Sequence, residues 1–118
     1  LGAEPEGAAD GYESLRQGRH VTELVPDTIC DGLRGTIGAP NLALLRRHRV
    51  EVLLVSDPEV VAAMRLAWER LKMIIEPSCA TVLAAVLRYP ERFAGRRVGL
   101  ILSGGNVDLA RLPWMERA

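Results

Sequence analysis

The sequence lacks the features that mark nucleic-acid-binding, membrane-spanning and disulfide-stabilised proteins. Its 15 basic residues balance 15 acidic ones, which argues against a nucleic-acid or membrane-surface partner. No apolar run approaches the roughly 20 residues of a membrane span, and the opening LGAEPEGAAD has neither the charged nor the apolar region of a signal peptide. The only two cysteines, Cys30 and Cys79, have the spacing of neither a metal site nor a disulfide framework. We therefore expect a cytoplasmic protein in a reducing compartment.

What is present is typical of a folded domain. A length of 118 residues suits one domain, and 48% hydrophobic with 25% charged residues is a globular composition. The chain starts without methionine, at Leu1-Gly2-Ala3, a stretch typical of the end of a strand. We therefore expect the sequence to be part of a longer polypeptide.

Apolar runs alternate with helical patterns along the chain. Helical segments are predicted where hydrophobic periodicity and boundary residues coincide, at about 8–17, 39–49, 56–74 and 78–90. Strands are predicted at 1–4, 51–55 and 98–102, the last two as buried strands. This alternation predicts an α/β fold with a parallel sheet.

The segment 56–74 carries the clearest helix signals. Asp57 is predicted to be its N-cap, and Pro58 suits the first helical position. Seven apolar residues fall at helical spacing and predict a core-facing stripe: Val60, Val61, Met64, Ala67, Trp68, Leu71 and Ile75. The segment 78–90 is apolar on nearly every side and is predicted to be buried.

The stretch ILSGGNVD, residues 101–108, follows the last predicted strand. Ser103-Gly104-Gly105-Asn106 would expose backbone and one hydroxyl at the carboxyl edge of the sheet. In open α/β sheets ligands bind at this edge. The alternative is an ordinary tight turn.

Four stretches occur together and in order: GAEPEGAADGY, PDTICDGLRGTIG, VSDPEVVAAMRLAWERLKMIIEPSCA and GRRVGLILSGGNVDL. Together they resemble the C-terminal part of the serine racemase and serine/threonine dehydratase family, pyridoxal-phosphate (PLP) enzymes of the tryptophan-synthase-β-like fold. The resemblance covers essentially all 118 residues. It implies that residues 1–118 are the C-terminal segment of the PLP-binding large domain, a helix-flanked parallel sheet, in a chain more than twice this length.

The resemblance implies that the Ser103 hydroxyl bonds the pyridine nitrogen of PLP, while Gly104 lets the backbone approach the ring. It places the Schiff-base lysine and the phosphate cup upstream. The only lysine present, Lys72, lies within a predicted helix. We therefore expect no catalytic residue in this chain and no activity from it alone.

Two further sites follow from the same resemblance. Glu4, the main-chain carbonyl of Ala8, and Asp10 match a divalent-cation site, and oxygen ligands favour Mg²⁺, Mn²⁺ or Ca²⁺. Capping of the first helix is the alternative role for both carboxylates. Lys72 and Asn106 match nucleotide contacts of some family racemases. Their alternatives are a solvated lysine and an asparagine that caps a following helix.

The function implied is a dehydratase that converts a small hydroxy amino acid to a 2-oxo acid and ammonia by β-elimination. Serine racemase and 3-hydroxyaspartate dehydratase are alternatives. A different class, a non-catalytic fragment or scaffold, stays open because the Schiff-base lysine region is absent from this sequence. The partners implied are the rest of its own polypeptide and a second copy in a homodimer.

Overall fold

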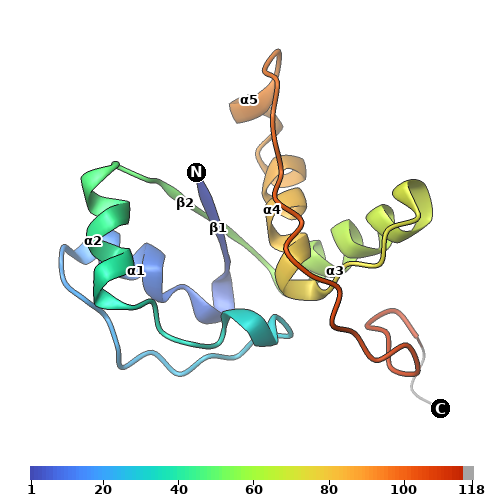
Figure 1. The fold of residues 1–118 in the computed structure, drawn as a ribbon, viewed down its shortest axis with the longest axis horizontal. Helices are drawn as coiled ribbons and strands as arrows, with labels where there is room; N and C mark the ends of the chain where they lie inside the picture. Colours follow the sequence, from blue (N-terminus) through green and yellow to red (C-terminus); the bar gives the residue numbers. More distant parts are fainter. Residues whose placement is uncertain (116–118) are drawn as a thin grey trace.

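The computed structural model of the chain describes residues 1–115 and centres on two short parallel strands (Figure 1). Strand β1, Gly2–Pro5, pairs with β2, Val52–Val55, so that Gly2 lies beside Val52 and Pro5 beside Val55. Both strands fall where the sequence predicted them. The fold is α/β, as expected.

Helices α1 and α2 lie on one side of this strand pair (Figure 1). A 3₁₀ turn, Glu6–Ala8, leads into α1, Asp10–Gln17. Gly18 ends α1 with a φ of 70°, a left-handed conformation that favours glycine. A second 3₁₀ turn, Asp31–Leu33, precedes α2, Ala39–Arg47. The glycine-rich segment 28–38, between α1 and α2, forms no helix longer than this turn.

Helix α3, Asp57–Leu66, begins with a capping box. The Ser56 hydroxyl accepts a bond from the Glu59 backbone N–H, and the Glu59 carboxylate accepts one from the Ser56 N–H at 2.7 Å. Ser56 is therefore the N-cap, and the prediction of Asp57 in that role is wrong. The capping box satisfies two free backbone donors reciprocally, which leaves the Asp57 carboxylate available for another partner.

The predicted helix 56–74 does not continue unbroken. A π-helical turn, Ala67–Leu71, follows α3, and Lys72 ends it with a φ of 58°. This wider turn changes the helical register, so part of the predicted stripe is wrong. Leu71 is 57% exposed, whereas Val60, Met64 and Ile75 are buried.

Helix α4, Pro77–Arg88, packs against α3 and both strands, and the short α5, Pro90–Phe93, follows it. Its Cys79, Ala80 and Ala84 belong to the main hydrophobic core. The prediction that α4 is buried on nearly every side is wrong, because Leu87 on its other face is 51% exposed. Small residues on the inner face let α4 approach α3 closely.

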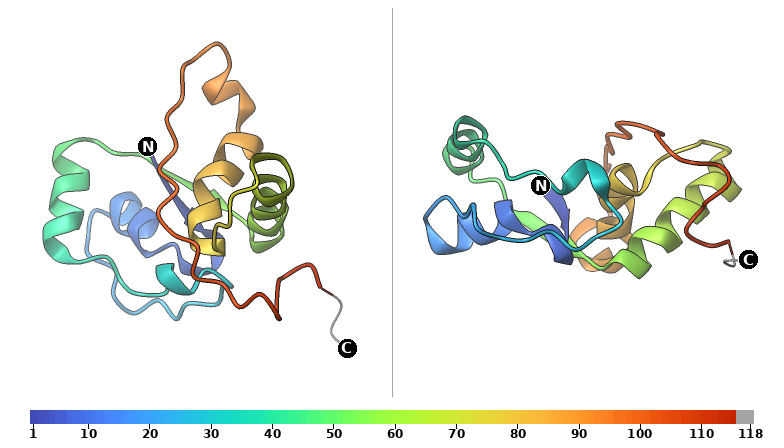
Figure 2. Two further views of the ribbon diagram at one scale, coloured as in Figure 1. Left: turned by 45° about the vertical axis from the view of Figure 1, so that its right-hand side comes forward. Right: turned by 90° about the horizontal axis from the view of Figure 1, so that it is seen from below.

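Residues 98–102 are extended but form no strand, so the predicted third strand is absent from the described part of the chain. Val98 is 43% exposed and Ile101 is 82% exposed. A strand needs a neighbouring backbone for its hydrogen bonds, and within residues 1–115 none lies beside this segment. Figure 2 shows the segment running back past α4 toward the C-terminal end.

Candidate functional site

The turn at residues 103–106 packs against the segment that leads into α4. The backbone N–H of Glu76 donates to the Gly104 carbonyl at 3.1 Å. A Cβ on Gly105 would lie 2.5 Å from the Ile74 carbonyl oxygen, and a Cβ on Gly104 would lie 2.2 Å from Glu76 Oε1. The backbone contact requires a glycine at 105, whereas at 104 the Glu76 side chain could move aside for a Cβ.

Ser103 is exposed at the start of this turn. Within residues 1–115 its hydroxyl takes part in no hydrogen bond. A hydroxyl can donate one bond and accept two, so this side chain is available to a ligand nitrogen. Its environment fits the role of partner to a pyridine ring.

Trp68 and Trp114 contact the segments on either side of the turn. The Trp68 indole N–H donates to the Ile75 carbonyl at 2.9 Å, next to the residues that contact the glycines. The Trp68 ring also meets Trp114 edge to face, with centroids 5.4 Å apart at 81°, a favoured arrangement for aromatic pairs. Trp68 thus links the segment before α4 to the segment that follows the turn. The helical spacing predicted only a core role for Trp68, and it did not indicate the contact with Trp114.

A second element of the region is the loop at residues 28–34, which polar side chains fix in place. The Asp57 carboxylate accepts bonds from the Thr28 hydroxyl at 2.5 Å and from the Ile29 N–H at 2.8 Å. The Arg34 guanidinium donates to the Thr28 carbonyl at 2.6 Å. The Ser78 hydroxyl, in the first turn of α4, accepts a bond from the Gly32 N–H at 3.0 Å. Sequence reasoning missed the contacts of Asp57 and Ser78 because they join residues 28, 29 and 46 positions apart.

The cysteine of this loop is not a nucleophile at neutral pH. Cys30 is fully buried in the core, and burial raises the pKa of its thiol to about 11. A thiol must ionise to react. Cys30 therefore has a packing role, and both cysteines are free thiols.

The Glu4 carboxylate lies at the N-terminal end of α1. It accepts backbone hydrogen bonds from Gly11 at 3.1 Å and from Tyr12 at 2.8 Å. This is the helix-end role that the sequence offered as the alternative to metal binding. Burial raises the pKa of Glu4, the Tyr12 bond opposes this rise, and repulsion by the Asp10 carboxylate adds to it. Two carboxylates therefore lie close together in a partly buried place.

Asp10 and Ala8, the other two predicted ligands, are both buried. Asp10 Oδ2 accepts a bond from the Ile37 N–H at 2.6 Å, which ties the loop before α2 to α1. Among the described residues, no three side chains of His, Cys, Asp or Glu gather as a metal cluster. Any cation here therefore needs main-chain oxygen in addition to the two carboxylates, as the sequence prediction with the Ala8 carbonyl required.

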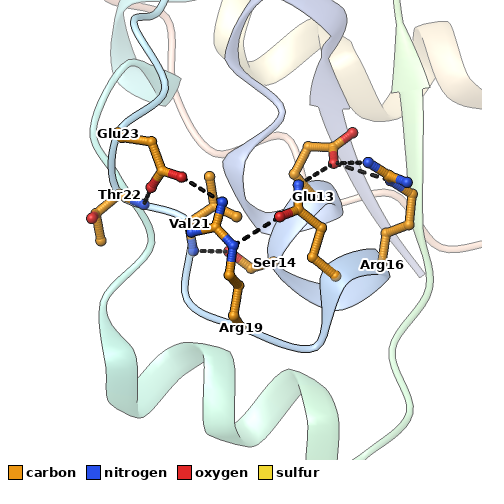
Figure 3. Close-up of polar contacts among 8 residues, drawn as sticks. Glu13, Ser14, Arg16, Arg19, Val21, Thr22 and Glu23 are labelled. Carbon is orange, nitrogen blue, oxygen red and sulfur yellow. Dashed lines mark hydrogen bonds and ion pairs between the residues drawn. The ribbon is translucent and has the colours of Figure 1, made fainter.

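Helix α1 and the segment after it carry ordinary polar contacts, drawn in Figure 3. Glu13 pairs with Arg16, and Arg19 pairs with Glu23. The buried Ser14 hydroxyl accepts a bond from the Val21 N–H at 2.9 Å and so fixes the chain after α1. These contacts join residues of α1 and of the segment after it, and they offer no site of their own.

Lys72 and Asn106, the predicted nucleotide contacts, are both exposed. The Lys72 ammonium donates to the Glu69 carbonyl at 2.7 Å and thereby closes the π-helical turn. The residues after Asn106 form only turns as far as residue 115. A helix-capping role for Asn106 is therefore wrong within the described chain.

The turn at residues 103–106 and the loop at residues 28–34 together indicate a class of protein. An α/β fold carries a glycine turn with a free hydroxyl, packed beside the N-terminal end of α4 (Figure 1). A tethered loop contacts the first turn of the same helix. Small-molecule sites of α/β proteins are commonly built from such turns and loops.

Comparison with known proteins identifies the family. Residues 1–104 match the family model described as pyridoxal-phosphate dependent enzyme. The chain belongs to the family of PLP-dependent enzymes. The resemblance found in the sequence is therefore confirmed at the level of the family.

Relatives and solved structures agree with this assignment. The chain is 44% identical over 114 residues to a β-hydroxyaspartate dehydratase of Paracoccus denitrificans, covering 97% of this chain and 36% of the relative. It is 45% identical to a serine racemase of Dictyostelium discoideum, covering 93% of this chain and 35% of the relative. The maize serine racemase structure superposes with a TM-score of 0.84 at 39% identity, covering 91% of this chain and 34% of that one.

The chain spans about a third of the length of the curated relatives that it matches. The described residues contain no helix long and apolar enough to cross a membrane.

Proposed function

We propose that this chain is the C-terminal segment of the PLP-binding large domain of a hydroxy-amino-acid ammonia-lyase. The whole protein converts a small hydroxy amino acid to a 2-oxo acid and ammonia by β-elimination. Elimination releases one water, and hydrolysis of the resulting imino acid consumes one, so the net products are the 2-oxo acid and ammonia. The observation that carries the proposal is the free, exposed hydroxyl of Ser103 at a glycine turn, in a chain that belongs to a PLP-dependent family.

The residues present fit the cofactor in part. Ser103 would hold the ring nitrogen, and Gly104 would let the backbone approach the ring. Lys72 does not fit the Schiff-base role, because its ammonium is bound to a carbonyl of its own helical turn. The Schiff-base lysine is therefore supplied by the rest of the polypeptide.

Bound PLP supplies the electron sink for bond cleavage at the substrate α-carbon. The Ser103 hydroxyl would donate a hydrogen bond to the ring nitrogen and leave that nitrogen unprotonated, whereas a carboxylate would hold a full proton there. An uncharged ring is a weaker sink. This suits β-elimination, because departure of the β-hydroxyl takes up the electrons released at the α-carbon.

Racemisation of serine is the second candidate, and the 45% identity to a serine racemase favours it. Both reactions remove the same α-proton. The base that returns a proton to the opposite face lies outside this chain. Dehydration of 3-hydroxyaspartate is supported in the same way by the Paracoccus relative. A non-catalytic scaffold is the outcome if the whole protein binds no PLP.

Replacement of Ser103 in the full-length protein tests the proposal. Ser103→Asp should place a proton on the ring nitrogen, shift the absorbance of bound PLP, and change the ratio of racemised to eliminated serine. Ser103→Thr keeps the hydroxyl and should retain the wild-type spectrum and ratio. An unchanged spectrum and product ratio in Ser103→Asp would show that Ser103 does not contact the ring.

We further propose that Glu4, the Ala8 carbonyl and Asp10 bind Mg²⁺, Mn²⁺ or Ca²⁺. The two carboxylates repel each other, and the pKa of Glu4 is raised. Both observations support the binding of a cation between them. A carboxyl with a raised pKa in the folded state stabilises the fold below its unfolded pKa. That contribution is lost as the pH rises through the folded pKa. A cation restores it by replacing the proton.

The metal proposal predicts a linked effect of pH and cation on the midpoint of thermal unfolding of the full-length protein. The midpoint should fall as the pH rises above the usual glutamate range and recover on addition of Mg²⁺. Glu4→Gln should lose both responses. Glu13→Gln, which removes the α1 carboxylate that pairs with Arg16, should keep both. An equal response to Mg²⁺ in wild type and Glu4→Gln would rule out the site.

Three further assignments extend the proposal, and the nucleotide contacts and the homodimer rest on the family resemblance. Lys72 and Asn106 are exposed and so accessible to a nucleotide. The whole protein is a homodimer, and its location is cytoplasmic, which the two free buried thiols support.

A further inference from the structure

The loop at residues 28–34 is closed on itself by hydrogen bonds. The Arg34 guanidinium joins its two ends, donating through Nε at 3.0 Å and Nη2 at 2.6 Å to the Thr28 carbonyl. Between these ends every backbone N–H, from Ile29 to Arg34, has an acceptor in the protein. A loop with its ends joined and its donors satisfied has little reason to rearrange internally. Its orientation as a unit therefore depends on contacts from outside the loop.

Within residues 1–115, two side chains outside the loop form hydrogen bonds with it, those of Asp57 and Ser78. Ser78 accepts from the Gly32 N–H, but the same N–H also donates to the Asp31 carboxylate at 2.8 Å. The Ser78 contact thus has a substitute inside the loop. The orientation of the loop depends chiefly on Asp57.

Asp57 holds the start of the loop through both of its carboxylate oxygens. Oδ1 accepts from the Thr28 hydroxyl, and Oδ2 accepts from the Ile29 N–H. The Thr28 hydroxyl in turn accepts a bond from the Cys30 N–H at 3.2 Å. Asp57 is the first residue of α3, where the positive end of the helix dipole favours a carboxylate. One charged group at a helix end therefore aligns three consecutive residues of the loop.

The exposed side of the loop and the turn at residues 103–106 meet at the same end of α4. Asp31 and Gly32 are exposed, and the Gly32 N–H contacts α4 at Ser78. The turn contacts the chain two residues earlier, at Glu76. Figure 2 shows the 3₁₀ turn of the loop close to this end of α4. A small molecule bound beside the turn therefore has the loop as a neighbour.

We propose that Asp57 is a positioning residue for the substrate. Its carboxylate holds the loop at residues 28–34 where the loop contacts a hydroxy amino acid bound beside Ser103. This inference rests on the proposed function and deepens it, because it assigns the substrate to the loop and the cofactor to the turn. The two roles are separable, since the turn packs on Ile74 and Glu76 and, within residues 1–115, forms no bond with Asp57.

The first test measures steady-state kinetics of the full-length protein with L-serine and 3-hydroxyaspartate. Thr28→Val removes the hydroxyl at nearly constant size. The substrate must then order the loop as it binds, so KM should rise about 10-fold while kcat stays within about twofold of wild type. The absorbance and affinity of PLP should not change. A wild-type KM in Thr28→Val would overturn the proposal.

Thr28→Ser is the matched control. It keeps the hydroxyl but loses a buried methyl group, so it should lower the unfolding midpoint and retain the wild-type KM. Tyr89→Phe removes a hydroxyl that bonds to the Leu54 carbonyl at 2.9 Å, at the opposite end of α4, and should behave in the same way. An equal rise of KM in Thr28→Ser and Thr28→Val would refute a positioning role, because packing alone would then explain both.

A double-mutant cycle tests whether Asp57 acts through Thr28. Asp57→Asn keeps the size of the side chain, removes its charge and leaves one acceptor oxygen in place of two, so KM should rise here as well. Combined with Thr28→Val, the rise should be little larger than that of either single variant, as expected for two partners in one contact. A rise equal to the product of the two single effects would show that Asp57 does not act through this contact.

Amide hydrogen exchange supplies a test that needs no turnover. The Ile29 amide should exchange at least about 10-fold faster in Asp57→Asn than in Thr28→Ser, which loses stability without losing the contact. Equal exchange in the two variants would contradict the role of Asp57. A wild-type protein that binds no PLP, or converts neither amino acid, would refute the proposed function. In that case the exchange of Ile29 would still decide whether Asp57 orients the loop.

Discussion

The two elements beside the N-terminal end of α4 are held in different ways. The loop at residues 28–34 is fixed by polar side chains, with Asp57, Arg34 and Ser78 each bonded to its backbone or hydroxyl. The turn at residues 103–106 is fixed by backbone contacts, and it depends on the absence of side chains at Gly104 and Gly105. One element is therefore sensitive to loss of a functional group, and the other to the addition of a methyl group.

The largest effect should follow from Asp57→Ala in the full-length protein. It removes two hydrogen bonds to a charged acceptor and leaves the buried Thr28 hydroxyl without its partner. We expect a loss of about 3 kcal/mol in the free energy of unfolding, measured by urea denaturation. Pro58→Ala, at the adjacent exposed position, is the control and should cost far less. A loss equal to that of the control would show that the side-chain tether is unimportant.

Gly105→Ala should have the next largest effect. The new Cβ would lie 2.5 Å from a backbone carbonyl, that of Ile74, which cannot rotate away. We expect a loss of about 2 kcal/mol by overpacking, together with weaker binding of PLP by the full-length protein. Urea denaturation and absorbance titration measure the two. Wild-type values for both would contradict the close packing of the turn.

Gly104→Ala sharpens the same comparison. Its Cβ would meet the Glu76 carboxylate, the far end of a flexible side chain. We expect a loss of about 1 kcal/mol, and Glu76→Ala in the same chain should reverse most of it. A loss larger than that of Gly105→Ala would show that Glu76 is held rigidly against the turn.

Ser78→Ala should have the smallest effect. The Gly32 N–H also donates to the Asp31 carboxylate at 2.8 Å, so a second acceptor remains after the hydroxyl is removed. We expect a loss of about 0.5 kcal/mol in the free energy of unfolding. Asp31→Ala combined with Ser78→Ala should cost more than the two single losses together, which a double-mutant cycle measures.

Local signals in the sequence were sufficient for part of the fold. The strands at β1 and β2 and the end of α1 at Gly18 depend on neighbouring residues, and each is where it was predicted. By contrast, local signals did not show that Ser56, and not Asp57, is the N-cap of α3. Both residues are good caps, and the choice depends on a contact between Asp57 and a loop 28 residues upstream.

Residues 98–102 show where local signals in the sequence were not sufficient. Their apolar composition predicts a strand, but a strand also requires a neighbour, and none is present in residues 1–115. The candidate site follows the same division. The residues Ser103 and Gly104 were identified from the sequence, whereas the packing of Gly104 against Glu76 and the tether through Asp57 depend on tertiary contacts.

The edge-to-face contact of Trp68 and Trp114 gives the segment a built-in optical reporter. These are the only two tryptophans among its 118 residues, and they join the π-helical turn to the stretch just beyond residue 106. Undocking of that stretch would expose both indoles to water and move their emission to longer wavelength. Steady-state fluorescence can thus follow this motion in solution without any added label.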